Sequence, residues 1–293
     1  MPTTFDLTSS DGTQIKAWRS GQPGVPLVIA NGLGTIPEAW PALMREGSGY
    51  DTLTWYQRGT FGSARPADRT HIRIEDHVED MLALMDDQGV DTALVACWSL
   101  GVNIAFEFAR RYPDRVAGIL AVAGVPGGTF ATMGGPLRIP RRLRRPLSLR
   151  AARTGALVGP ALTWLTPKIP VNDRTAWLVA HTGFMLPAAK ADVVVPMLKE
   201  FLQHDWRWYG RLAVAADAHA PMDLQFVTCP VALVAGKHDL LTSVHDVVAC
   251  ADQMPHATVT VLPGSQFLPL EYPEELHDAL DDLAGRVSRS GTA

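Results

Sequence analysis

The sequence has few cysteines and lacks any long apolar run. Its three cysteines, Cys97, Cys229 and Cys250, have none of the spacings typical of a zinc site or a redox pair, and so sparse a set is typical of a reducing compartment. No apolar stretch reaches the roughly 18 residues of a membrane span. The N-terminal residues lack the basic and apolar regions of a secretory signal. We therefore expect a cytoplasmic protein.

The sequence also lacks a strong excess of charge. The 293 residues carry a formal net charge of -4, and 47% of them are hydrophobic, which is enough for a large core. Without a basic excess, nucleic acid is not an expected partner. Nothing in the sequence specifies an oligomeric state.

What the sequence does contain is a serine between a short apolar run and a helical pattern. The run 93–96 predicts a buried strand, and Ser99 follows it, with Cys97 two residues before and Gly101 two residues after. Ile104, Ala105, Phe108 and Ala109 then have the spacing of one helix face. A serine in a tight turn between strand and helix is the context of a nucleophile elbow. A serine that merely caps the helix is the alternative.

Strand patterns alternate with helix patterns on both sides of this stretch. Segments 3–9, 14–19, 26–30, 50–57, 116–124, 230–237 and 257–262 predict strands, and 71–87, 240–254 and 274–287 predict helices. This order predicts an α/β fold with a mostly parallel, doubly wound sheet. The strand 26–30 ends in the glycine-rich loop Asn31-Gly-Leu-Gly34. Such a loop either supplies a backbone donor to an oxyanion hole or is a plain strand-to-helix connection.

The alternation stops between about Pro126 and Leu224, where several helices are expected instead. We predict a core of residues 1–125 and 225–293 with a helical cap inserted at 126–224. Seven arginines fall between Arg138 and Arg153, and no acidic residue occurs between Arg115 and Asn172. We favour a solvated basic helix face, and contact with an anionic head group or membrane surface is the alternative. Most of the aromatic residues and methionines of the insertion are expected to form its core, among them Trp164, Trp177, Phe184, Trp206 and Trp208.

Five motifs in one order resemble the α/β-hydrolase family across nearly the whole chain. Asn31-Gly-Leu-Gly34 is similar to the family's His-Gly-x-x oxyanion loop, and Tyr56-Gln-Arg-Gly59 with Gly62-Ser63 loosely resembles its D-x-R-G-x-G-x-S loop. Cys97-Trp-Ser-Leu-Gly101 stands where the family has G-x-S-x-G. Gly236-Lys-His-Asp239 matches G-x-x-D, and Gly264-Ser-Gln-Phe267 with Glu271-Tyr-Pro273 matches G-x-H-x…E-x-P.

The resemblance implies an eight-stranded sheet, a helical cap and a serine hydrolase site that needs no cofactor and no metal. Ser99 would be the nucleophile and Asp239 the acid of a triad, while the backbone N–H groups of Leu33 and Leu100 would bind the oxyanion. We expect substrate contacts from four further residues of these motifs, namely Asn31, Gly32, Trp98 and Phe267.

One departure from the family stands at the position of the catalytic histidine, which is Gln266. An amide does not titrate near neutral pH, so it can hold a hydrogen bond but cannot act as the general base. Loss of this histidine lowers turnover in serine hydrolases by a factor on the order of 10⁶. We do not expect His238, His256, His181, His204 or His219 to replace it. Either the sequence is a deliberately inactivated hydrolase or it is a natural relative that lost hydrolysis.

The resemblance favours a hydrolase of carboxylic esters, thioesters or lipid-like substrates. Its substrate would be a small hydrophobic ester-like molecule, and Gln266 would impair its activity. A binding protein or receptor on a hydrolase scaffold is the second hypothesis, and a lyase, cyclase or acyltransferase is the third. The dehalogenase and epoxide-hydrolase branches fit less well, because they need an aspartate where Ser99 stands.

Overall fold

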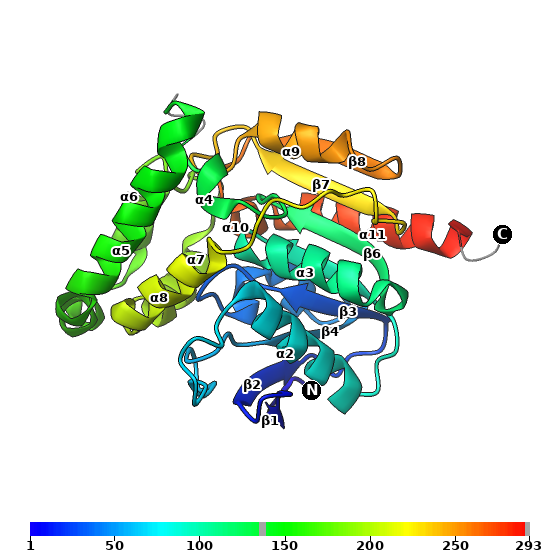
Figure 1. Ribbon diagram of the computed structural model, residues 1–293, viewed down its shortest axis with the longest axis horizontal. Helices are drawn as coiled ribbons and strands as arrows, with labels where there is room; N and C mark the ends of the chain where they lie inside the picture. Colours follow the sequence, from blue (N-terminus) through cyan, green and yellow to red (C-terminus); the bar gives the residue numbers. More distant parts are fainter. Residues whose placement is uncertain (135–138, 291–293) are drawn as a thin grey trace.

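The computed structural model describes residues 1–134 and 139–290. It contains an eight-stranded sheet in the order β1-β2-β4-β3-β5-β6-β7-β8 (Figure 1). The strands are β1 (Thr3–Thr8), β2 (Gln14–Arg19), β3 (Val25–Ala30), β4 (Tyr50–Trp55), β5 (Ala93–Trp98), β6 (Val116–Val122), β7 (Val231–Gly236) and β8 (Ala257–Leu262). Strand β2 pairs antiparallel with β1 and β4, and all the other pairings are parallel. The predicted α/β fold with a mostly parallel sheet is confirmed.

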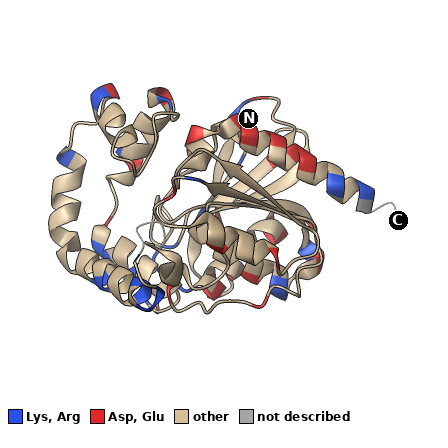
Figure 2. Cartoon of the chain, turned by 90° about the horizontal axis from the view of Figure 1, so that it is seen from above, with Lys and Arg blue, Asp and Glu red and all other residues tan. Residues whose placement is uncertain are grey.

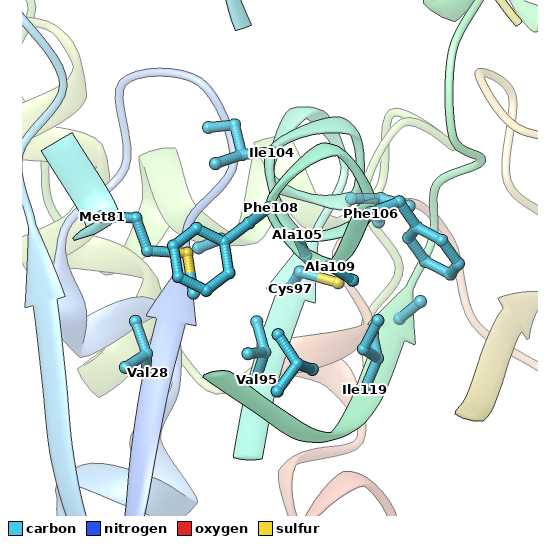
Figure 3. Packing of buried hydrophobic residues seen from close by; sticks show 14 of the residues in the cluster. Val28, Met81, Val95, Cys97, Ile104, Ala105, Phe106, Phe108, Ala109 and Ile119 are labelled. Carbon is cyan, nitrogen blue, oxygen red and sulfur yellow. The ribbon is translucent and has the colours of Figure 1, made fainter. Parts of the chain in front are cut away.

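Helices cover both faces of this sheet. Helices α2 (Ile74–Asp87), α3 (Leu100–Arg111) and α9 (Val244–Ala251) cover one face, and α1 (Pro41–Met44) and α11 (Pro273–Ser290) cover the other. The core between the sheet and helices α2 and α3 includes Val28, Val95 and Cys97 from the strands, which pack under Met81 and Phe108 (Figure 3). The central strands are apolar throughout because a parallel sheet is buried on both faces.

Two short helices border the site region. The 3₁₀ helix η1 (Pro37–Ala39) follows the loop after β3, and α10 (Leu268–Glu271) precedes α11. A further 3₁₀ turn, η2 (Pro113–Arg115), leads into β6.

The segment between β6 and β7 consists of helices, which we call the cap helices. They are α4 (Thr129–Thr132), α5 (Arg141–Leu165), α6 (Asp173–Ala180), α7 (Ala191–Phe201) and α8 (Trp206–Ala216), with η3 (Thr166–Lys168) after α5. Helix α5 packs along α8, and α6 packs on α7. The division of the chain at residues 126 and 224 stays a prediction.

Two expectations about local structure were wrong. The helix expected over 240–254 begins only at Val244, because the side chain of Ser243 accepts the backbone N–H of Asp246 and caps it there. Trp164, Trp177 and Phe184 are not core residues, since 67%, 61% and 43% of their surface is exposed. None of the described helices is long and apolar enough to cross a bilayer.

Candidate active site

Ser99 stands in a strained turn at the carboxyl end of β5. Its backbone angles are φ 55° and ψ -115°, a conformation that costs a non-glycine residue about 1–3 kcal/mol. The turn brings the start of α3 against β3, because a Cβ placed on Gly101 would lie 1.8 Å from the carbonyl oxygen of Ala30. Only glycine fits there. Such a turn presents the serine side chain at the edge of the sheet, as a nucleophile elbow does.

Two backbone donors lie at the same edge of the sheet as Ser99. Leu33 follows β3 and Leu100 follows β5, and these strands are parallel neighbours, with Ala30 opposite Cys97. Among the described residues, neither the N–H of Leu33 nor that of Leu100 has a hydrogen-bond acceptor. Unpaired N–H groups at one edge are suited to receive an oxyanion. The role of Leu33 and Leu100 in an oxyanion hole remains a prediction.

Two side chains that the sequence analysis did not single out for this role hold the loop after β3. Gln57 accepts the N–H of Gly34 at 2.9 Å, and its amide donates to the carbonyl oxygens of Asn31 and Gly32 at 3.3 and 3.4 Å. His204 contacts the carbonyl oxygen of Gly34 through Nε2 at 2.8 Å. Burial lowers the pKa of His204, and the neutral ring donates this hydrogen bond. The loop is therefore fixed from the core by Gln57 and from the cap helices by His204.

Asp239 follows β7 and is almost completely buried. Its Oδ1 accepts the backbone N–H groups of Leu241 and Thr242 at 2.7 and 3.0 Å, whereas Oδ2 has no partner among the described residues. The pKa of Asp239 is raised to about 7, chiefly by burial; the N–H groups of Thr242 and Leu241 oppose the shift, and the charge of Glu271 adds to it. The carboxyl group thus lacks the cation that normally holds a triad acid ionised.

Gln266 is buried beside Ser99 and is oriented by the backbone of Ala123. Its Nε2 donates to the carbonyl oxygen of Ala123 at 2.9 Å, while its Oε1 has no partner among the described residues. The hydroxyl of Thr242, whose N–H binds Asp239, reaches the same carbonyl at 3.5 Å. Two buried acceptors, one on Asp239 and one on Gln266, therefore remain unpaired in this part of the site.

The loop that carries Gln266 is fixed by Glu271. The carboxylate of Glu271 accepts the backbone N–H of Ser265 at 2.7 Å and its hydroxyl at 2.6 Å. The backbone carbonyl of Gln266 also accepts the indole N–H of Trp98 at 2.8 Å. The position of the amide is thus determined by buried contacts on both sides.

Ser99 and Gln266 line one small cavity of about 20 Å³, which holds about one water molecule. Helix α4 and the residue after it cover this cavity. The lining residues are Ser99, Asn103, Gly124, Val125, Thr129, Thr132, Met133, Leu241, Thr242 and Gln266. No histidine from the described part of the chain lines it. A base for Ser99 is therefore missing from its immediate surroundings.

The residues that we predicted as substrate contacts lie outside this lining. The side chain of Asn31 accepts the indole N–H of Trp40 and donates to Thr54, at 2.9 and 3.3 Å. Trp98 is buried, and a Cβ on Gly32 would lie 3.2 Å from its ring. The role of Asn31, Gly32, Trp98 and Phe267 as substrate contacts stays a prediction. Phe267 is half-buried and packs edge-on against Trp98.

The other histidines considered as a replacement for the base either contact residues outside the site or are exposed. His181 is exposed and stacks on Trp177, and His219 lies 3.3 Å from Glu75. His238 and His256 are exposed. Within residues 1–134 and 139–290, no group of three or more acidic, histidine or cysteine side chains is arranged to hold a metal ion.

The chain belongs to the α/β-hydrolase fold family, whose model matches residues 25–273. Epoxide hydrolase B of Mycobacterium tuberculosis is 31% identical over 180 residues, which cover 55% of this chain and 45% of that enzyme. The chain thus spans about half the length of the epoxide hydrolases that it matches. The 3-oxoadipate enol-lactonase 2 of Acinetobacter baylyi is 24% identical over 279 residues, or 92% of each chain.

Solved structures show the same fold. A thermophilic esterase from Thermogutta terrifontis superposes with a TM-score of 0.74 at 18% identity and covers 97% of this chain and 99% of its own. The enol-lactonase from Burkholderia xenovorans gives 0.71 at 20% identity, with 96% and 100% covered. These relatives are hydrolases.

Proposed function

We propose that the chain is a serine hydrolase of carboxylic esters or lactones whose turnover is held low by Gln266. The observation that carries the proposal is the strained Ser99 turn beside Gln266, with Asp239 at the end of β7. In this account Ser99 Oγ bonds to the substrate carbonyl carbon and the bond to the leaving alcohol breaks. The N–H groups of Leu33 and Leu100 receive the charge on the carbonyl oxygen.

Removal of the proton from the Ser99 hydroxyl limits this reaction. A histidine would take it and pass it to the leaving alcohol, but the amide of Gln266 does neither. The proton therefore goes to water, and turnover is slow. An activated ester such as a p-nitrophenyl ester is the suitable probe, because p-nitrophenolate leaves without being protonated.

Lactone and ester chemistry is favoured over epoxide chemistry by the nucleophile. The epoxide-hydrolase branch, by resemblance, uses a carboxylate at the elbow, and here the residue is Ser99. The enol-lactonase relative, whose match spans 92% of both chains, supports the same preference.

The test is to restore the base. Gln266→His is assayed beside the wild-type protein on p-nitrophenyl esters of graded chain length and on simple lactones. We expect a gain in kcat/KM of about 10²-fold or more, in the range typical of general base catalysis. The matched control is the same variant with Ser99→Ala, which should return to background. No gain, or a gain that survives Ser99→Ala, contradicts the proposal.

A binding function is the second candidate, and the fixed amide of Gln266 favours it. Gln266 has a stable partner in Ala123 and leaves Oε1 free for a ligand donor. Thermal stabilisation by a ligand that persists in Ser99→Ala, with no turnover in Gln266→His, is the result that supports this second function.

A further inference from the structure

Helix α5 packs mainly against α8, and it also contacts α4. Its packed side meets α8 through small residues: a Cβ on Gly159 would lie 2.3 Å from the backbone N of Arg207, and one on Gly210 would lie 2.7 Å from Ala156. The hydroxyl of Thr163 accepts the backbone N–H of Trp206 at 3.0 Å. The two helices therefore lie in close contact, and the rest of the surface of α5 faces away from this contact.

Large apolar side chains occupy the side of α5 that α8 does not cover. Six of them are between 43% and 76% exposed: Leu143, Leu147, Leu157, Val158, Trp164 and Leu165. Leu143, Leu147, Val158 and Leu165 recur at the spacing of a single helix face. The helix has 25 residues, so this face is about 37 Å long. An apolar face of this length on a surface helix indicates a binding surface.

Unpaired cations lie beside this apolar face. Arg142, Arg150 and Arg153 are exposed and have no ion-pair partner among the described residues, whereas Arg145 pairs with Asp217 at 3.1 Å. At 100° per residue, the three free arginines fall on the same side of the helix as Trp164.

Acidic residues are absent from this helix. Helix α5 contains none, and Figure 2 shows Lys and Arg gathered at the lower left, where α5 begins. Arg138, which we grouped with these arginines, lies outside the described residues. At the other end of α5, the ammonium of Lys168 lies 3.0 Å from the ring centroid of Trp164.

We propose that the uncovered side of α5 docks on the surface of a membrane that contains anionic phospholipid. The free arginines bind the phosphates, and the exposed leucines and Trp164 enter the boundary between head groups and acyl chains. This combination of a basic and an apolar stripe on one helix suits an anionic interface. A second copy of the chain fits less well, because it would bring two sets of unpaired arginines together. The inference is independent of the proposed function.

The test is co-sedimentation of the purified protein with vesicles. Vesicles of phosphatidylcholine alone are compared with vesicles that also contain phosphatidylglycerol. The protein should bind the anionic vesicles, and raising the salt from about 0.05 M to about 0.5 M should release it, because screening shortens the reach of the arginines. Arg150→Gln with Arg153→Gln should weaken binding about 30-fold.

The apolar part of the surface is tested separately. Leu147→Ser with Trp164→Ser should weaken binding about tenfold or more while leaving the salt dependence in place. The matched control is Lys199→Gln with Val261→Ser, an exposed cation on α7 and an exposed apolar residue on β8, which should bind like the wild type.

Three results overturn the proposal. The first is no binding of the wild-type protein to anionic vesicles at low salt, which needs no variant. The second is binding that both double variants retain. The third is a dimer in sedimentation velocity that Leu147→Ser with Trp164→Ser abolishes, since a second copy would then be what covers α5.

Discussion

At the residue scale, the chemistry of the site depends on the pair Asp239 and Gln266. An imidazole at position 266 would pair with Asp239 and hold its pKa low when protonated. The amide of Gln266 instead binds Ala123, and Asp239 is left buried with a pKa of about 7. The amide therefore leaves Ser99 without a base and leaves Asp239 without a cation that would favour its ionised form.

The raised pKa of Asp239 predicts a pH-dependent cost to stability. The folded protein binds this proton up to about pH 7, whereas the unfolded chain releases it near pH 4. The contribution of Asp239 is therefore present below pH 4 and lost as pH rises to about 7. Asp239→Asn should gain in unfolding free energy relative to the wild type over this range, by up to about 4 kcal/mol.

Urea denaturation of the two proteins from pH 4 to pH 8 measures this difference. Other titrating groups are common to both and cancel in the comparison. A difference that stays constant with pH, or that shrinks as pH rises, contradicts the account of Asp239.

At the scale of elements, the loop after β3 is held between the core and the cap helices. Gln57 binds it from the segment after β4, and His204 binds it from the segment after α7. His204 also packs against Phe61 and Tyr209, with ring centroids 4.8 and 5.4 Å away. The cap helices thus help to position the N–H of Leu33.

Gln57→Leu should loosen this loop. In the Gln266→His background we expect kcat to fall about tenfold or more with a smaller change in KM, because the donor at Leu33 would be misplaced in the transition state. The measurement is steady-state kinetics on a p-nitrophenyl ester. Asp192→Asn, an exposed change on α7, is the control. An increase in KM with unchanged kcat would mean that Gln57 shapes substrate binding instead.

At the scale of the whole molecule, Arg58 connects parts of the chain that are distant in sequence. Its guanidinium binds Asp80 of α2 at 2.7 Å and Asp11 of the β1–β2 turn at 2.6 Å. Its backbone oxygen accepts the indole N–H of Trp208 in α8 at 2.7 Å. Asp80 and Asp11 raise the pKa of Arg58, and His77 together with Arg58 lowers the pKa of Asp80, despite the burial of both Arg58 and Asp80.

Arg58→Met should destabilise the fold strongly. It leaves the buried carboxylate of Asp80 without its guanidinium partner, which costs about 3–5 kcal/mol. Chemical denaturation measures the loss. Arg45→Met removes the exposed pair with Glu274 and should cost at most about 1 kcal/mol. Equal effects of the two substitutions would show that burial does not set the strength of the Arg58 contacts.

The fold and the positions of Ser99, Asp239 and Gln266 were predictable from sequence because they depend on local patterns. Buried parallel strands are apolar throughout, and the side chains of the candidate site follow at or near their ends. Gln57 and His204 were not assigned to the loop, because they reach Gly34 from 23 and 170 residues away. Helical spacing likewise cannot tell which face of α5 has a partner. The sequence therefore did not distinguish Trp164, which is exposed, from Trp208, which is buried.

The central claim is that Ser99 is a nucleophile without its base, and mass spectrometry of the wild-type protein tests it most directly. After incubation with a p-nitrophenyl ester at pH 8, we expect one acyl group on the peptide that contains Ser99. It should persist, because water attacks the acyl-enzyme slowly without a base. Acylation at another residue, no acylation, or hydrolysis by the wild type as fast as by Gln266→His would contradict the account.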